Sequence, residues 1–150
     1  MIESLPTTDR TLIEFFKKIS PALARAALFI VFFWFGALKI ISASPANPLV
    51  SELLDKTMPF LTFHSFIIGF GIYEMIIGVL FIIPRAERAA IALLVPHMIT
   101  TILPLILLPA ITWQKFLVPT LEGQYIIKNL VIIALAFSIA AQLHPLKKQS

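Results

Sequence analysis

Glu74 is the only charged residue in the apolar segment GFGIYEMIIGVLFII, which covers residues 69–83. A charged carboxylate that faced lipid at this depth would cost on the order of 3 kcal/mol, so Glu74 must face protein, a cation or water. Gly71 and Gly78 lie on the same helical face as Glu74, and small residues there let another helix or a ligand come close. We therefore expect the Glu74 face to be the packed inner face of this segment.

Lys39, in the segment FWFGALKII, is the cation best placed to pair with Glu74. The two segments are expected to cross the membrane in opposite directions, and each side chain leans toward the start of its own helix. The two side chains therefore lean toward each other across a depth difference of about 9 Å. Lys128 leans away instead, and we expect it to extend toward the outer membrane surface.

Further polar residues fall at similar depth in the later apolar segments, and together they predict a polar pocket that opens outward and is closed toward the cytoplasm. We expect Glu74, His97 and Lys39 to border this pocket; the other contributors are Thr100, Thr101, Pro104, Lys128 and Asn129. Structural roles remain open for each of them. The ion pair could fix helix register, the threonines could bond to carbonyls of their own helix, and His97 could be a hydrogen-bonded core histidine.

The composition is typical of a membrane protein, because 59% of the residues are hydrophobic and only 13% are charged, whereas soluble domains have about one quarter charged residues. Four apolar segments are each close to the roughly 20 residues that a helix needs to cross the hydrocarbon core. They cover residues 22–41, 63–83, 89–110 and 125–143. We predict an all-α membrane protein, an antiparallel four-helix transmembrane bundle that forms a single domain over residues 1–150.

Lysine and arginine residues are concentrated at one end of the predicted bundle, and the positive-inside rule places that end in the cytoplasm. This group comprises Arg10, Lys17, Lys18, Arg25, Arg85, Arg88, Lys147 and Lys148, whereas the opposite loops carry only Lys56 and Lys115. Both termini should therefore be cytoplasmic. The net charge of +4 does not indicate a nucleic-acid partner, because these cations flank apolar segments and do not form one soluble face.

Three flanking features predict contacts with the membrane surface. The stretch TLIEFFKKIS places Leu12, Phe15 and Phe16 on one helical face, which is typical of a short amphipathic helix at the interface; a plain extension of the first span is the alternative. Asn47 and Pro48 suit the N-cap and first turn of a short external helix. In the second external loop, Trp113 and Phe116 suit the aromatic belt.

Several kinds of chemistry are excluded by what the chain lacks. Without cysteine there are no disulfides, thiol relays or Fe–S clusters. His64, His97 and His144 are expected at different depths, so no pair could ligate a haem, and one histidine with one glutamate is too few for a metal site. No nucleophile triad, phosphate loop or dinucleotide fingerprint is present. We expect no stand-alone enzyme; a proton or anion path remains, or a site for a polar-headed lipophile such as a quinone.

Three motifs carry a family resemblance: FWFGALK at residues 33–39, GIYEMIIGVL at residues 71–80, and LEGQYIIKNLVII at residues 121–133. With an arginine in the turn after the second span, they resemble the DoxX-like superfamily of small four-helix bacterial membrane proteins. The likeness is greatest to the branch with inner-membrane proteins of reactive-chlorine resistance, although the first external loop is shorter here. The family's recurring positions would be Trp34, Gly36, Lys39, Glu74, Gly78, Lys128 and Asn129.

The resemblance implies a multi-pass protein of the bacterial inner membrane that is tied to oxidative stress or to quinone-linked electron transfer. The leading expectation is an accessory subunit whose outward pocket binds a quinone-like or other small molecule. One alternative is a small-solute or proton transporter that uses Glu74 and Lys39. The other is a structural partner subunit without a ligand. The expected partners are the lipid bilayer, other membrane redox proteins and further copies of the chain.

Overall fold

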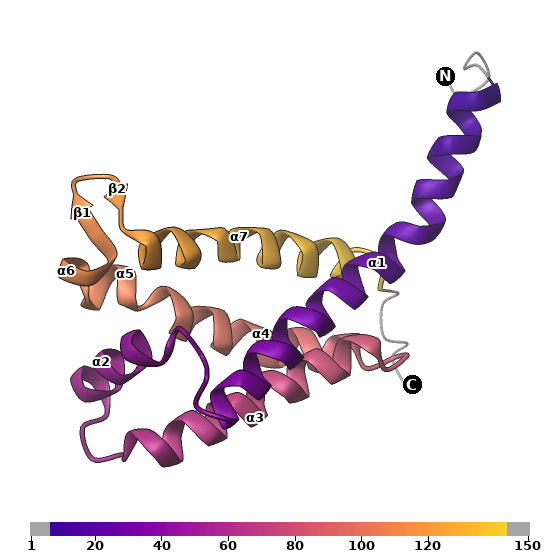
Figure 1. Ribbon diagram of the computed structural model, residues 1–150. Coiled ribbons are helices and arrows are strands. Elements are labelled where there is room, and N and C mark those ends of the chain that lie inside the picture. Colours follow the sequence, from indigo (N-terminus) through magenta and orange to yellow (C-terminus); the bar gives the residue numbers. More distant parts are fainter. Residues whose placement is uncertain (1–6, 144–150) are drawn as a thin grey trace, which may run out of the picture.

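The computed structural model describes residues 7–143 of the 150, so His144, Lys147 and Lys148 lie outside the described residues. The described part is mostly helical, with a single two-stranded hairpin (Figure 1). In chain order its elements are α1 (Thr7–Ile40), α2 (Asn47–Thr57), α3 (Phe63–Ile82), α4 (Glu87–Ile102), α5 (Pro104–Leu107), α6 (Pro109–Thr112), β1 (Trp113–Lys115), β2 (Val118–Pro119) and α7 (Leu121–Ala140).

Four helical stretches within residues 7–143 are long and apolar enough to cross a membrane: Thr8–Ile40, Phe63–Ile82, Glu87–Leu107 and Leu121–Ala140. At about 1.5 Å per residue, each reaches the roughly 30 Å of a hydrocarbon core. Large apolar side chains also cover the outside of the molecule, for example Trp34, Val95 and Leu130, each more than half exposed. This surface suits lipid, and the predicted number and approximate positions of the spans are confirmed.

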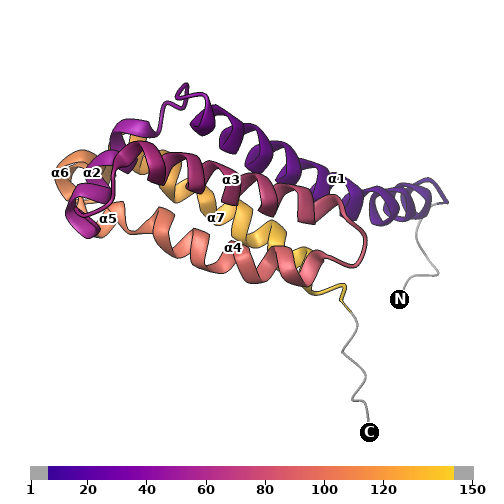
Figure 2. The same cartoon turned by 90° about the horizontal axis from the view of Figure 1, so that it is seen from below.

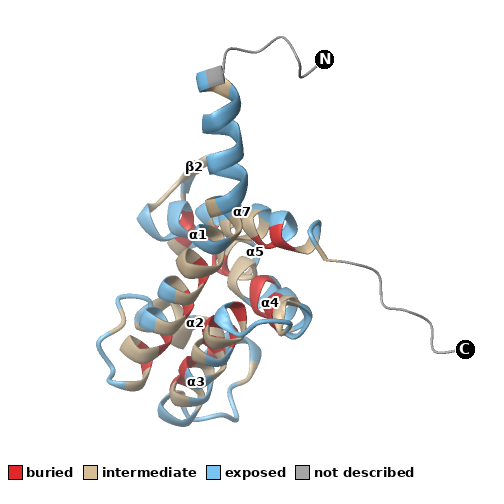
Figure 3. Ribbon diagram, turned by 90° about the vertical axis from the view of Figure 1, so that its right-hand side faces the viewer, coloured by how far each residue is buried: buried red, intermediate tan, exposed pale blue. Residues whose placement is uncertain are grey.

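The long helices lie side by side, with α1 along α3, α3 along α4, and α4 along α7, while α1 also touches α7 (Figure 2). We call the end that carries α2, α5, α6 and the hairpin the capped end, and the end with the loop between α3 and α4 the turn end. Buried residues concentrate where the helices face one another (Figure 3). The buried hydrophobic cluster consists of Leu28, Phe32, Ile77, Phe81, Ala90, Leu94, Met98, Ala136 and Ile139.

The prediction of a separate amphipathic N-terminal helix is wrong, because α1 is continuous and contains Pro21 in its interior. A proline removes only one backbone hydrogen bond from a helix, and long apolar helices tolerate this loss. The first part of α1 extends past the turn end of the bundle (Figures 1 and 2). Its apolar residues Leu12, Phe15 and Phe16 are exposed there.

We predicted that the third apolar segment forms one helix over residues 89–110, but the structure does not contain such a helix. It is divided into α4, α5 and α6, and the two short helices begin at Pro104 and Pro109. Proline is favoured in the first turn of a helix because its missing N–H is one that has no partner there in any case. The divided segment folds back over the capped end, where Thr112 is completely buried and donates to Leu108 O at 3.0 Å.

The predicted short helix is present as α2 and begins at Asn47 with proline in its first turn, but its N-cap is Ala46 and no side chain caps it. Asn47 therefore does not have the capping role that we predicted, and its Oδ1 is buried without a partner in the described part. Lys56 Nζ donates to Leu107 O at 2.6 Å, which ties the end of α2 to the end of α5. The capped end is thus held by side chains that bond to free helix carbonyls.

At the turn end, Arg25 joins α1 to both neighbouring helices. Its Nε donates to Phe81 O at 2.7 Å and its Nη2 donates to Ile83 O at 3.1 Å. These carbonyls lie at the end of α3, where the helix leaves them without partners of its own. Arg25 Nη1 also lies 2.6 Å from Glu87 Oε1 in the first turn of α4. One arginine therefore fixes α1 against both sides of the turn.

Glycines allow α1 and α3 to touch backbone to backbone. A Cβ atom added to Gly71 would lie 2.7 Å from Gly36 O, and one added to Gly36 would lie 2.5 Å from Gly71 O. One turn beyond Glu74, a Cβ atom at Gly78 would lie 2.9 Å from Phe33 N. The nearest obstructing atoms belong to the backbone of the other helix, so no movement of a side chain could make room for a Cβ atom. The predicted close-packing role of Gly36, Gly71 and Gly78 therefore follows directly from the geometry.

We predict that Gly71→Ala lowers the free energy of unfolding by about 1–3 kcal/mol, as overpacking of a well-packed interface does. Gly69 in the same helix is the matched control, because nothing lies within 4 Å of a Cβ atom placed there. Gly69→Ala should be neutral or stabilising by up to about 1 kcal/mol. Both are measured by thermal unfolding in detergent, and equal losses in the two variants would contradict the close α1–α3 contact.

Candidate functional site

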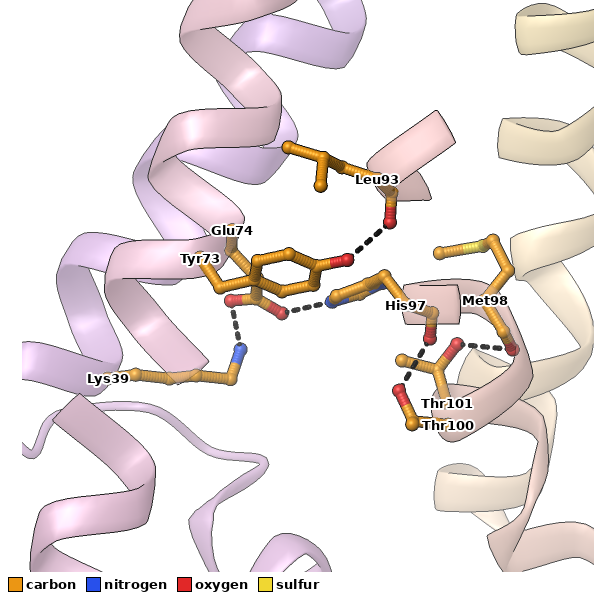
Figure 4. A network of polar contacts seen from close by, with 8 residues as sticks. All are labelled: Lys39, Tyr73, Glu74, Leu93, His97, Met98, Thr100 and Thr101. Atoms are coloured by element: carbon orange, nitrogen blue, oxygen red, sulfur yellow. Dashed lines mark hydrogen bonds and ion pairs between the residues drawn. The ribbon is translucent and has the colours of Figure 1, made fainter. Parts of the chain in front are cut away.

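The candidate site is a group of three buried polar side chains that come from three different helices (Figure 4). Lys39 lies in the last turn of α1, Glu74 in the middle of α3 and His97 in α4. Their exposed fractions are only 5%, 5% and 3%. We call Lys39, Glu74 and His97 the buried triad.

The Glu74 carboxylate is the centre of the buried triad, and both of its oxygens are used. Lys39 Nζ lies 2.6 Å from Oε2, and His97 Nε2 lies 2.9 Å from Oε1. The predicted pair of Lys39 and Glu74 is therefore confirmed. The carboxylate loses its hydrogen bonds to water when it is buried, and two hydrogen bonds and one positive charge replace them. An unpaired buried charge would lack this compensation.

The bond between His97 and Glu74 was not predicted, since we expected His97 to remain free for a ligand. A signal for it was present in the sequence. Glu74 and His97 lie about equally far from the turn that joins α3 to α4, and residues equidistant from a hairpin turn lie at similar depth. Periodicity could not show which way His97 faces, because α4 is apolar on nearly every side.

The proton in this bond can be placed by the chemistry of the two groups. An ionised carboxylate only accepts hydrogen bonds, so His97 Nε2 carries the proton that points at Glu74. Nδ1 of His97 is buried and has no hydrogen-bond partner among the described residues. When the imidazole is neutral, the triad contains one positive and one negative charge, and its formal charge is zero.

Aromatic rings enclose the buried triad. The Phe70 ring stacks on the His97 ring at a centroid distance of 5.1 Å, and the Phe32 ring meets it edge-on at 5.3 Å. The ring centroid of Tyr73 lies 6.1 Å from that of His97, and its hydroxyl donates to Leu93 O at 2.6 Å. Lys39 Nζ lies 5.6 Å from the Phe70 centroid. This apolar shell keeps water from the ion pair and strengthens it electrostatically.

The cavity that we expected between Glu74, His97 and Lys39 is not found. Glu74 contacts both Lys39 and His97 directly, and the space beside Gly71 and Gly78 is filled by α1. Two grooves of about 350 and 420 Å³ lie elsewhere along α3, and no triad residue lines either of them. The glycines serve close helix contact and leave no room for a ligand.

The other predicted site residues do not join the buried triad. Thr100 Oγ1 donates to His97 O at 2.7 Å and Thr101 Oγ1 donates to Met98 O at 3.0 Å, so both bond to carbonyls of their own helix. Lys128 is exposed, with its Nζ 4.9 Å from the centroid of the Tyr125 ring. Asn129 is half-buried in α7 and makes no hydrogen bond within the described part. The structure supports the alternative, structural interpretation of the two threonines.

A quinone head group needs hydrogen-bond donors for its two carbonyl oxygens, and no side chain of the buried triad lines either groove. The larger groove is lined by Leu61, Ser65, Phe66, Gly69, Phe70 and Tyr73. The Tyr73 hydroxyl already donates to Leu93 O, whereas Ser65 Oγ accepts from Thr62 and keeps its own O–H as a donor. One serine hydroxyl is too few donors for both carbonyl oxygens, so the residues in their present arrangement do not fit a quinone. No three metal-ligating side chains gather anywhere within residues 7–143.

Comparison of the chain with models of protein families, with curated proteins and with solved structures gives no match. The functional argument therefore rests on the geometry of the buried triad and its surroundings.

We predict that Glu74→Gln is strongly destabilising, by about 3–5 kcal/mol, because it leaves the Lys39 charge buried without a counter-ion. Lys39→Met should cost less, since His97 still donates to the remaining carboxylate. The double variant should recover part of the loss of Glu74→Gln alone. Thermal unfolding in detergent measures all three.

The ion pair of Arg10 with Glu14 on the exposed part of α1 provides the control, because its side chains are 63% and 65% exposed. Glu14→Gln should leave the melting temperature almost unchanged, since exposed pairs contribute little. Strictly additive losses in the Lys39 and Glu74 variants would show that the two groups do not stabilise each other.

Proposed function

We propose that this chain is a DoxX-like integral membrane protein of a bacterial inner membrane. In this proposal the four apolar stretches form an antiparallel bundle with both termini on the cytoplasmic side. The orientation is supported by Arg25, Arg85 and Arg88, which lie at the turn end. The family is supported by the way four of its recurring positions meet between α1 and α3: Gly36, Lys39, Glu74 and Gly78.

We further propose that the protein acts as an accessory membrane subunit linked to redox stress, in which the buried triad is a static lock between α1, α3 and α4. The observation that carries this proposal is that both oxygens of the buried Glu74 are already bonded to protein cations or donors. A site that binds a substrate keeps polar groups free to meet it. Here the carboxylate is engaged at both oxygens by the other two ionisable groups, and their effect is to hold three helices in one arrangement.

A transporter is the weaker candidate, because the described residues between the buried triad and the turn end form no polar route. That half of the bundle interior is filled by buried apolar side chains, among them Leu28, Phe81 and Ala90. A proton or solute path through a membrane requires polar groups or water along its length. Toward the capped end, the nearest hydroxyls, those of Thr100 and Thr101, are bonded within their own helix.

A second candidate function is the binding of a quinone-like ring in the groove of about 420 Å³ along α3. The observation that favours it is the buried His97 Nδ1, which has no partner among the described residues. Phe70 lines this groove and also stacks on the His97 ring. With its proton on Nε2, the neutral His97 ring can only accept a hydrogen bond at Nδ1, so its partner would be the hydroxyl of the reduced, quinol form, and Phe70 would first have to be displaced.

Cysteine labelling tests the proposed orientation, and the natural absence of cysteine makes single-site labelling clean. We predict that an impermeant thiol reagent labels Glu52→Cys in α2 and Glu122→Cys in α7 from outside intact cells. Pro84→Cys, in the turn between α3 and α4, should be labelled only after the cells are opened. All three positions are exposed. Labelling of Pro84→Cys in intact cells would overturn the orientation.

Proteoliposomes distinguish the three functions. As a static lock, the protein should dissipate a pH gradient no faster than protein-free liposomes, and Glu74→Gln should change nothing. Flux that depends on Glu74 would establish the transporter. Saturable binding of a short-tailed quinol without flux would establish the second candidate. In that case Gly69→Leu should abolish binding while the fold is kept, because a side chain at this position enters open space on the groove.

A further inference from the structure

The hairpin of β1 and β2 ends in two large apolar side chains that are almost free of contacts. Trp113 pairs with Pro119 and Lys115 with Val118, so Phe116 and Leu117 form the turn. Phe116 is 90% exposed and Leu117 is 72% exposed. Large apolar side chains contribute most to stability when they are removed from water, so their exposure at the tip of the hairpin requires an explanation.

The backbone at the tip is also strained in a way that its sequence does not relieve. Leu117 has a φ of 58°, in the left-handed region where the Cβ atom crowds the following carbonyl group. Glycine or asparagine normally occupies such a turn position. A leucine here gains nothing for the turn itself. The strain therefore points to a use for the leucine side chain.

The hairpin has a rigid base that fixes the direction of its tip. Thr120 N donates to Thr112 O at 3.0 Å, and Thr120 Oγ1 donates to Ile111 O at 2.7 Å. Trp113 Nε1 donates to Leu105 O at 3.0 Å, so this tryptophan is tied to α5, while its place in the aromatic belt stays a prediction. Gly123 in α7 packs so closely against Thr112 O that a Cβ atom would not fit.

The hairpin projects sideways from the bundle beside the first turn of α7, and not straight beyond the capped end (Figures 1 and 3). α7 exposes apolar side chains that suit lipid, with Leu130, Val131 and Phe137 between 63% and 70% exposed. Nearer the hairpin, the same helix carries Tyr125 with Lys128 over its ring. Aromatic rings and lysines at the end of a span are typical of the boundary between hydrocarbon and head groups.

We propose that the β1–β2 hairpin is a membrane anchor that inserts Phe116 and Leu117 into the lipid interface beside α7. The occupant of this surface is lipid and not a protein, because the hairpin projects sideways at the start of α7 (Figure 1), a helix whose exposed side chains are largely apolar. Lys115, which is exposed next to Phe116, and Lys128 on α7 match the phosphate groups of lipid head groups in charge. The anchor depends on neither the family nor the accessory role, since it needs only that α7 crosses the membrane.

Electron paramagnetic resonance tests this anchor in the full chain, reconstituted in nanodiscs of phosphatidylethanolamine and phosphatidylglycerol. A spin label is attached to Phe116→Cys, and Gln114→Cys in β1 is the matched control because Gln114 is also exposed. Molecular oxygen concentrates in lipid, whereas a charged nickel chelate stays in water. The label at position 116 should collide more with oxygen and less with the chelate than the label at position 114.

Two outcomes would overturn the proposal. Equal access of the chelate to positions 116 and 114 would place the tip in water. Protection of position 116 from both reagents would place it against protein, which would make the tip a contact with a partner or a second copy. Leu117→Asn with the label at position 116 provides a further check. Asparagine suits this turn position, and the variant lacks the second apolar side chain. The label should therefore become more accessible to the chelate.

Discussion

The contact of 2.6 Å between Lys39 Nζ and Glu74 Oε2 constrains how the whole bundle is packed. A carboxylate at this depth cannot remain unpaired, and a lysine can reach it only if the two helices approach closely. Gly36 and Gly71 allow this approach one turn away from the pair, since a Cβ atom on either would collide with the backbone of the other helix. The close glycine contact and the ion pair therefore depend on each other. His97 then extends the arrangement to α4 through the second carboxylate oxygen.

Arg25 fixes the same helices at the turn end, where it bonds to the last carbonyls of α3 and to Glu87 of α4. Between these two polar contacts the interior is apolar, with Phe32, Ile77 and Leu94 in the buried cluster. Together the two polar contacts hold α1, α3 and α4 at two levels. α7 contributes buried apolar residues to the same cluster but no side chain to either polar contact. Its outer face and the hairpin before it thus remain available to the surrounding lipid.

The sequence predicted the four spans because their length and hydropathy are set by the membrane, and it predicted the pair of Lys39 and Glu74 because side-chain direction follows from helix direction. It could not predict that His97 faces Glu74, since the rotation of an almost uniformly apolar helix leaves no periodic signal. The expected pocket failed for a related reason. Gly71 and Gly78 are compatible both with room for a ligand and with close backbone contact, and only the position of α1 decides between them. The sequence also does not decide whether α1 continues through Pro21. The proline removes one hydrogen bond from the helix, and the helix continues only if the stability of the turns on either side outweighs that loss.

The central claim is that Lys39 and Glu74 are in direct, lasting contact inside the bilayer. Solid-state nuclear magnetic resonance measures this contact most directly, through the dipolar coupling between ¹⁵Nζ of lysine and ¹³Cδ of glutamate in protein reconstituted in lipid. We predict a strong coupling from one lysine and one glutamate, which disappears in Lys39→Met and persists in Glu14→Gln. A sample whose helices are folded, yet whose spectrum shows no coupling that depends on Lys39, would contradict the account.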